Sequence, residues 1–153
     1  MFPVMRRSDL ELPREKLLTL LADADWISVA FNSPLGYPYI TAVNHVIFKE
    51  RVYFHCASEG FKLDCLEQDQ RVCLQAVVAA EIIAEEYTTR YLSVTAFGRA
   101  RLLESKEEKR LVLIELMKRF APSVMPECIS QDHGGLSVVE VVVDHVTGKG
   151  RWR

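Results

Sequence analysis

The sequence predicts a mainly β protein of the α+β class: an antiparallel sheet of about six strands that closes into a barrel, with flanking helices. Three observations predict this class. Six segments are rich in β-branched and aromatic residues, several of them are joined by short turns, and some, such as Leu136 to Val146, are apolar at nearly every position. A strand that is apolar on both faces needs cover on both. We therefore expect a barrel interior on one face and a helix or a second subunit on the other.

The elements follow one another in a single domain over residues 1–153. A helix begins at Pro13, because proline suits a first helical turn. Further helices are expected over 58–69 and 106–120, where apolar residues recur at helical spacing. Strands are expected over 26–31, 39–48, 51–56, 71–80, 90–103 and 136–146. The prolines and glycines between 121 and 135 predict a loop.

Composition narrows the class of protein. The formal net charge of −2 does not suggest a nucleic-acid-binding protein, which would carry a basic excess. No apolar stretch approaches the roughly 20 residues that span a bilayer, and the first residues do not resemble a secretory signal. The four cysteines form no Cys-x-x-Cys pair, so a zinc ribbon is not expected. We expect a cytoplasmic protein with reduced thiols, no membrane partner and no metal site.

The segment from His55 to Lys62 carries the clearest functional signal. It runs from a strand through Ser58 and Gly60 into a helix that Ser58 is predicted to cap. A helix N-terminus and a nearby lysine suit an anion such as a phosphate. One lysine leaves a phosphate monoester partly uncompensated, and Arg90 is a candidate for a second cation. Many ligand-free proteins also contain a Ser-x-x-x-Lys helix start, so the spacing alone leaves both interpretations open.

Other residues carry weaker signals. His55 either binds or protonates a ligand, or simply bonds to backbone at a strand end. His45, His55 and Cys56 lack the second spaced pair that a metal site would show. The Thr147 to Lys149 segment resembles a phosphate-binding turn but lacks the rest of a P-loop. Trp152 is either a loose end or an aromatic anchor.

Five segments in a fixed order carry a family resemblance. They are Pro38 to Asn44, Val52 to His55, Glu59 to Asp64, Arg71 to Cys73, and Tyr91 to Ala100. This ordered set resembles the pyridoxamine 5′-phosphate oxidase-like, FMN-binding split-barrel superfamily, and most of all its nitroimidazole-resistance-type flavoproteins. The resemblance extends from about Arg6 to Lys149.

The resemblance implies a split β-barrel that forms a homodimer, with two FMN molecules in clefts between the subunits. Carried over by position, the cofactor-binding residues are Thr41, Ala42, Val43, Asn44, Val46, His55, Ser58, Lys62, Tyr91, Ser93 and Lys149. The strand from Thr41 to Val46 would follow the flavin ring, Ser58 and Lys62 would bind the phosphate, and Lys149 and Trp152 would reach the partner's site. His55 is the expected catalytic proton donor.

Two positions depart from the family pattern. Phe61 stands where oxidases of the superfamily commonly have arginine, which removes a cation from the phosphate site. His45 stands where the nitroimidazole-resistance group often has an aromatic residue, and it either tunes the ring or points away. The residues that bind pyridoxamine phosphate in the true oxidases are not recognisable, so vitamin B6 synthesis is not expected.

The first functional hypothesis is an FMN-dependent oxidoreductase that passes electrons from a reduced nicotinamide to a small acceptor, such as a nitro-aromatic compound. A second is a non-catalytic flavin-binding sensor or carrier. A third keeps the barrel but fills it with a deazaflavin or with haem, for which His55, His133 and His145 are candidate ligands. A fourth is an interaction dimer with an empty cleft.

Overall fold

The structure is a computed structural model and describes residues 1–123 and 135–151. The described strands are β1 (Ile27–Asn32), β2 (Pro38–Val43), β3 (Val46–Phe48), β4 (Arg51–Ala57), β5 (Arg71–Ile83), β6 (Thr88–Leu102) and β7 (Leu136–Arg151). The helices are α1 (Arg14–Asp23), α2 (Phe61–Gln68) and α3 (Lys106–Phe120), with short 3-10 turns η1 (Ser8–Leu10) and η2 (Ala84–Glu86).

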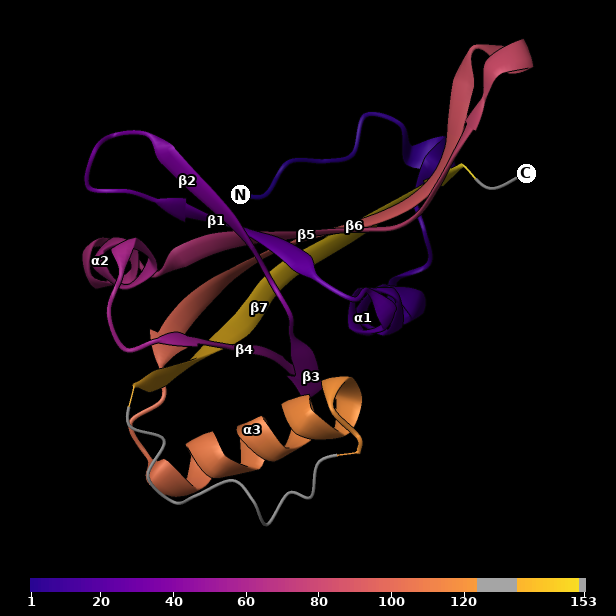
Figure 1. Cartoon of the computed structure of the whole chain (residues 1–153). Coiled ribbons are helices and arrows are strands. Elements are labelled where there is room, and N and C mark those ends of the chain that lie inside the picture. Colours follow the sequence, from indigo (N-terminus) through magenta and orange to yellow (C-terminus); the bar gives the residue numbers. More distant parts are fainter. Residues whose placement is uncertain (124–134, 152–153) are drawn as a thin grey trace.

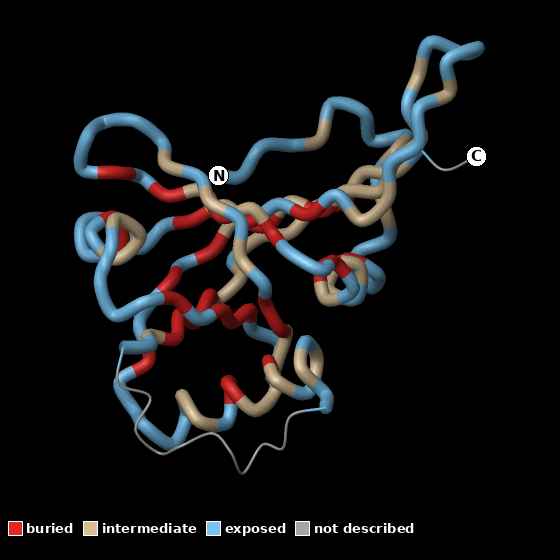
Figure 2. Tube along the Cα trace, viewed as in Figure 1, coloured by how far each residue is buried: buried red, intermediate tan, exposed pale blue. Residues whose placement is uncertain are grey.

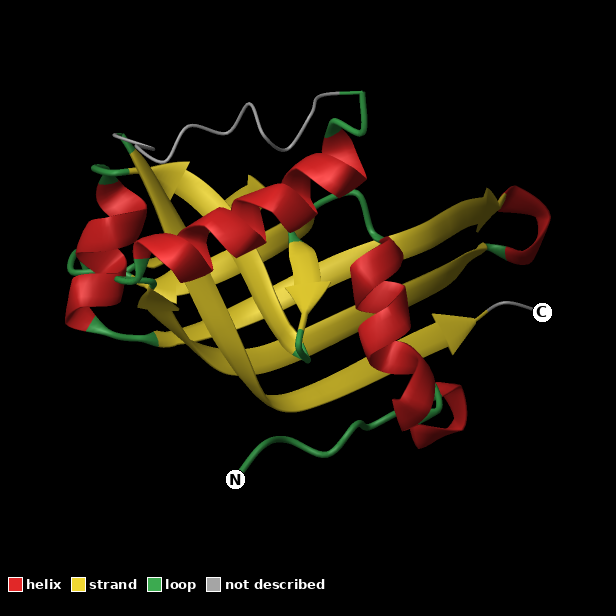
Figure 3. Ribbon diagram, turned by 90° about the horizontal axis from the view of Figure 1, so that it is seen from below, coloured by secondary structure: helices red, strands yellow, loops and turns green. Residues whose placement is uncertain are grey.

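All seven strands belong to one antiparallel sheet in the order β2-β1-β5-β6-β7-β4-β3. The sheet curls into an open half-barrel (Figures 1 and 3). The predicted fold class is therefore confirmed, with one correction to the strand count. The segment expected as a single strand over 39–48 is two strands, because the chain leaves the sheet at Asn44 and His45.

The helices cover both faces of the curled sheet: α1 and α2 lie on its inner face, and α3 lies on its outer face. Helix α1 packs against β5, β6 and β7, and α3 packs against β3, β4 and β7 (Figure 3). The main core lies between the sheet and α1 and α2, while a second cluster of Val46, Tyr53, Leu103, Val112, Leu113, Leu116 and Val138 lies under α3. The buried segments lie where the helices pack on the strands (Figure 2).

The outer face is only partly covered. Helix α3 covers it over β3, β4 and β7, but the large apolar side chains of Ile40 and Val77, on β2 and β5, are 63% and 59% exposed. The N-terminal arm, residues 1–7, also crosses this face (Figure 1). Phe2 of the arm stacks on His145, with ring centroids 4.7 Å apart and planes 5° apart, and it also contacts Phe97. The outer face of β2 and β5 is therefore available to a partner.

The break between β2 and β3 joins the sheet to α1. The fully buried His45 Nε2 lies 2.6 Å from the carbonyl oxygen of Leu21, in the last turn of α1. Asn44 Nδ2 donates to Asp25 O at 2.8 Å. Arg119, near the end of α3, donates to the carbonyls of His45 and Ala24 at 2.8 and 2.6 Å. The carbonyls at the end of α1 therefore receive side-chain donors from two other elements.

The segment Thr147-Gly148-Lys149 is part of β7, so the phosphate-turn resemblance noted in the sequence is wrong. Its glycine and Gly150 make room for the chain that precedes α1. A Cβ on Gly148 would lie 2.2 Å from Leu17 Cδ2, and one on Gly150 would lie 2.7 Å from Leu12 Cδ2. These glycines serve helix–sheet packing.

Candidate functional site

The turn between β4 and α2 presents its backbone openly. Ser58 N–H donates to Gly135 O at 3.1 Å, which ties the turn to the start of β7. The residue that caps α2 is Gly60, and Ser58 makes no capping hydrogen bond, so the predicted cap at Ser58 is wrong. Gly60 has φ +129°, a backbone conformation that favours glycine, and no atom lies within 4 Å of the position of a Cβ there. A ligand can therefore approach the first amides of α2 closely.

Lys62 supplies the positive charge of this turn. Its side chain is half-buried at the start of α2 and makes no ion pair with the described residues. Burial raises the pKa of the neighbouring Cys56 thiol, and the Lys62 ammonium partly opposes that rise, which places the lysine beside the end of β4. The lysine and the amides of α2 together form an anion-binding arrangement.

Phe61 occupies the first position of α2 and faces the core. Its ring packs edge-on against Tyr39 of β2, with centroids 5.0 Å apart and planes at 75°. Tyr39 in turn lies 6.0 Å from the ring of Phe31. An arginine at this position would lose that packing. At this departure from the oxidase pattern, Phe61 makes an aromatic contact in place of the second cation that an arginine would supply.

His55 lies on β4 opposite Val138 and is exposed. Its neighbours Phe54 and Cys56 are buried, because alternate residues of a strand point to opposite faces. His55, Ser58 and Lys62 are near one another in the sequence, but the His55 side chain points to the face of β4 opposite Cys56, the residue beside which Lys62 lies. The imidazole is accessible to a ligand or to solvent.

The predicted ring-contacting strand divides into different environments. Thr41 and Val43 lie opposite the buried Val29 and Ile27, so they face the core side of the sheet, whereas Ala42 is exposed. Asn44 bonds to Asp25 O. Val46 is buried under α3, and only its backbone is free for another role. Of the two alternatives for His45, the structure shows that its ring points away, into the protein interior toward Leu21 O.

Tyr91, Ser93 and Lys149 form a second group on β6 and β7. Lys149 Nζ lies 5.8 Å from the centroid of the Tyr91 ring, and Ser93 Oγ donates to Lys149 O at 3.4 Å. The turn around Ser58 adjoins Gly135 at the other end of β7, roughly 45 Å away along the strand at about 3.3 Å per residue. Within one chain, the two groups of predicted cofactor-binding residues therefore lie far apart (Figure 1).

Arg90 lies far from Lys62 within the same chain. It lies near the tip of the β5–β6 hairpin, where its Nη1 is 3.8 Å from Glu81, far from α2 in the sheet. His145 packs against the rings of Phe2 and Phe97, which also contact each other. His133, Cys128 and Trp152 lie outside the described residues.

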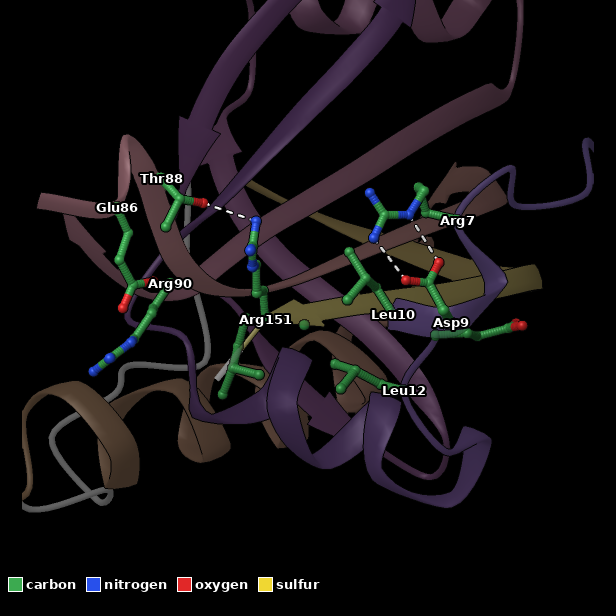
Figure 4. Close-up of a pocket in the computed structure, with 11 residues that line it drawn as sticks. Arg7, Asp9, Leu10, Leu12, Glu86, Thr88, Arg90 and Arg151 are labelled. Atoms are coloured by element: carbon green, nitrogen blue, oxygen red, sulfur yellow. Dashed lines mark hydrogen bonds and ion pairs between the residues drawn. The ribbon is translucent and has the colours of Figure 1, made fainter. Parts of the chain in front are cut away.

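A cavity that the sequence did not indicate lies at the same hairpin. Its volume is about 660 Å³, and it is lined by Arg7, Asp9, Leu10, Glu11, Leu12, Glu86, Thr88, Arg90, Leu92, Gly150 and Arg151 (Figure 4). No short motif could reveal it, because its walls come from three separated parts of the chain.

Two further properties bear on function. Across residues 1–123 and 135–151, no helix has the length and apolar character needed to cross a bilayer. The same ranges hold no group of three or more His, Cys, Asp or Glu side chains arranged to bind a metal ion.

Comparison with known proteins identifies the family. The profile of the pyridoxamine 5′-phosphate oxidase family matches residues 13–150, so the chain belongs to this family. A search of curated proteins found no significant match. Among solved structures, a candidate 5-nitroimidazole antibiotic resistance protein from Bacteroides thetaiotaomicron is 24% identical, with a TM-score of 0.81 over 92% of this chain and 86% of that chain.

Two other solved structures share the fold. A FAD- and haem-binding protein from Mycobacterium smegmatis is 19% identical, with a TM-score of 0.78 over 92% of this chain and 72% of that chain. A flavocytochrome from Azotobacter vinelandii is 22% identical, with a TM-score of 0.75 over 98% of this chain and 73% of that chain.

Proposed function

We propose that the protein binds FMN and works as an FMN-dependent oxidoreductase. The observation that carries the proposal is Lys62 at the start of α2, without an ion-pair partner among the described residues and following the open Gly60, in a chain of the pyridoxamine 5′-phosphate oxidase family. The names of the flavin-binding structural relatives support a flavin as the ligand.

The donor set of the β4–α2 turn fits a flavin phosphate. The amides at the start of α2 would donate to phosphate oxygens, Lys62 would supply one full charge, and the Ser58 hydroxyl is exposed and available. A bound flavin supplies the redox chemistry. His55, three residues before Ser58 and exposed, would hold or deliver a proton at an imidazole nitrogen.

We further propose that two chains form a homodimer through the outer face of β2 and β5. The separation between Lys62 and the Tyr91–Lys149 group supports this, because the second group would reach the flavin bound by the partner. Ile40 and Val77 would supply apolar contact area on that face. The partner's lysine would also offer the second cation that Phe61 does not provide.

The electron donor and acceptor follow from family likeness. A reduced nicotinamide would deliver electrons, and a small acceptor, for which the Bacteroides relative suggests a nitro-aromatic compound, would receive them. The rival function is a flavin-holding sensor or carrier. Turnover with a nicotinamide and a panel of acceptors distinguishes the two, since a carrier would be reduced and reoxidised no faster than free FMN.

Haem is the second candidate ligand, because two structural relatives are named for it. It would require an axial ligand, and His55 and His145 are available among the described histidines. His145 packs against two aromatic rings, with its Nε2 buried and without a partner among the described residues. A deazaflavin is a third candidate for the same cleft.

The first experiment is a visible absorption spectrum of freshly purified protein, followed by mass identification of the released ligand. Flavin bands and the mass of FMN support the proposal. A haem Soret band replaces the cofactor, and the mass of a deazaflavin or of FAD changes it. A colourless protein that does not bind added FMN refutes flavin binding.

The second experiment measures the phosphate contribution at Lys62. Apoprotein is titrated with FMN and with riboflavin, and the ratio of the two dissociation constants reports the phosphate contacts. Charge-assisted hydrogen bonds of about 1.5–3 kcal/mol predict a ratio between about tenfold and a hundredfold. Lys62→Gln should reduce this ratio about tenfold, whereas Lys118→Gln, which removes an exposed lysine on α3, should not. An unchanged ratio in Lys62→Gln would place the phosphate elsewhere.

Two more variants test the remaining parts. Val77→Glu should shift the protein to monomers in light scattering and weaken FMN binding, because it places a charge on the outer face of β5. His55→Ala should slow reoxidation by an acceptor while FMN stays bound. Loss of FMN from His55→Ala would instead make this histidine a binding residue.

A further inference from the structure

The cavity beside the β5–β6 hairpin is lined by residues other than those assigned to the proposed flavin site. The chain before α1 pairs with the edge of β7, where Leu12 N–H donates to Gly148 O at 2.9 Å and Glu11 pairs with Lys149. Leu12 then lies over Gly150 and beside Leu92. This pairing holds residues 7–12 over the strands and creates one wall of the cavity.

The cavity adjoins the group proposed to reach the flavin. Leu92 and Gly150 are paired across β6 and β7, next to Leu12 on the inner face. Tyr91 and Ser93 alternate with Leu92 along β6 and therefore face the other side. Asp9 raises the pKa of Arg7, and Tyr91 adds to that rise; Arg7 lowers the pKa of Asp9, and Lys149 adds to that lowering. The Arg7–Asp9 pair therefore lies beside the Tyr91–Lys149 group, at one margin of the cavity.

Two guanidinium groups flank the cavity. Arg151 Nη1 donates to Thr88 Oγ1 at 2.9 Å on one side. On the other side Arg7 bonds to both carboxylate oxygens of Asp9, at 2.8 and 2.6 Å. Leu10 and Leu12 lie between these two pairs (Figure 4). The carboxylate holds Arg7 in place, while Arg151 has a hydroxyl and no carboxylate partner among the described residues.

The charges of the lining select the kind of anion. Three arginines, Arg7, Arg90 and Arg151, are balanced by Asp9, Glu11 and Glu86. A dianion such as a phosphate monoester would meet these carboxylates without enough compensation. Arg151 carries the locally uncompensated charge, so a single carboxylate is the better match. Arginine binds carboxylates well because its planar fork offers parallel donors.

We propose that this cavity binds a small organic monocarboxylate. Its carboxylate accepts hydrogen bonds from Arg151 and from the remaining nitrogen of Arg7. Its apolar part lies on Leu10, Leu12 and Leu92. The volume of about 660 Å³ is within the range of small-molecule sites. The proposal does not depend on the flavin.

Calorimetric titration of the full chain with butyrate, hexanoate and octanoate tests the apolar part of the site. Affinity should rise about fourfold per buried methylene, the fold-change that corresponds to about 0.8 kcal/mol. Inorganic phosphate should bind more weakly than hexanoate. Phosphate binding more tightly than hexanoate, or no dependence on chain length, would overturn the proposal.

Variants test the charged part. Arg151→Gln should weaken hexanoate binding at least tenfold and leave the weak binding of 1-hexanol unchanged. The matched control is Arg99→Gln, which removes an exposed arginine paired with Asp144 outside the cavity and should leave hexanoate affinity unchanged. Circular dichroism and thermal melting confirm that both variants are folded. Equal hexanoate affinity in wild type and Arg151→Gln, or equal affinity for hexanoate and 1-hexanol, would refute carboxylate recognition.

Lys62→Gln separates this site from the proposed phosphate turn. Hexanoate affinity of the flavin-free protein should be the same in wild type and in Lys62→Gln. Weaker hexanoate binding in Lys62→Gln would mean that the carboxylate occupies the turn at Lys62, and it would overturn the assignment to this cavity. If the protein does not bind FMN at all, the prediction for hexanoate is unchanged, so the two proposals fail independently.

Discussion

Replacing His45 by glutamine tests the physical role of the buried junction between β2 and β3. Burial lowers the pKa of His45 to about 4, against the effect of its bond to Leu21 O and with a further lowering by Arg119. Because Leu21 O is an acceptor, Nε2 must carry the proton and Nδ1 must be bare. Nδ1 is buried and has no partner among the described residues. Protonation would therefore bury a charge beside an arginine.

The direction of the pH dependence follows from linkage. In the unfolded chain the pKa of a histidine is about 6.5, so the unfolded state binds more protons than the folded state between about pH 6.5 and 4. The contribution of neutral His45 to the free energy of unfolding is fully present above about pH 6.5 and is lost as the pH falls toward 4. The full loss is about 3 kcal/mol at 1.36 kcal/mol per pKa unit, and about 2 kcal/mol is lost between pH 7.5 and 5.

Urea denaturation of flavin-free protein at a series of pH values measures this loss. Glutamine can donate to Leu21 O but does not titrate, so His45→Gln should lose about 2 kcal/mol less stability than wild type between pH 7.5 and 5. Subtracting one profile from the other removes the pH dependence that both proteins share, including that of carboxyl groups whose pKa values are lowered by ion pairs, such as Asp144 beside Arg99. Parallel pH profiles for the two proteins would refute the reasoning, because His45 would then accept a proton in the folded state.

Three other changes have expected outcomes that thermal or urea denaturation can measure. The two-residue turn between β3 and β4 holds Lys49 at φ 50° and Glu50 at φ 61°, so Lys49→Asn with Glu50→Gly should stabilise the protein by about 1–2 kcal/mol; no gain would mean that these residues are not strained. Gly98→Ala should destabilise by more than about 3 kcal/mol, because its Cβ would lie 2.4 Å from the backbone oxygen of Val142; a smaller loss would mean that β7 can shift. Glu140→Gln should cost about 1–3 kcal/mol, because the buried carboxylate accepts from one tyrosine and two arginines; an unchanged stability would show that solvent replaces these bonds.

Much of the fold follows from local patterns. Helix α3 has the predicted bounds, and Ser105 caps it by accepting from Glu108 N at 3.3 Å. Helical periodicity is strong over a long amphipathic segment, so such elements are readable without tertiary information. The turn leading to Lys62 was also predictable from the sequence, because strand, glycine and helix follow one another within a few residues.

Local patterns misplaced the residues whose role depends on distant neighbours. Ser58 has the chemistry of a helix cap, but its amide bonds to Gly135, and the helix begins after Gly60. The apparent phosphate turn at Thr147 to Lys149 is strand, because Gly148 accommodates Leu17 and Leu12 of the preceding segments. Arg90 has the right charge to assist Lys62, but the hairpin carries it away from α2.

The sequence by itself determined a curled antiparallel sheet with three helices, and it predicts an anion-binding turn at Lys62, because alternation, helical periodicity and turn chemistry are properties of neighbouring residues. Only the tertiary structure decided that His45 faces Leu21 and that Tyr91 and Lys149 lie far from Lys62 in the same chain. It also created the cavity between Arg7 and Arg151. These relations depend on where segments far apart in the chain meet, and no local pattern encodes that meeting.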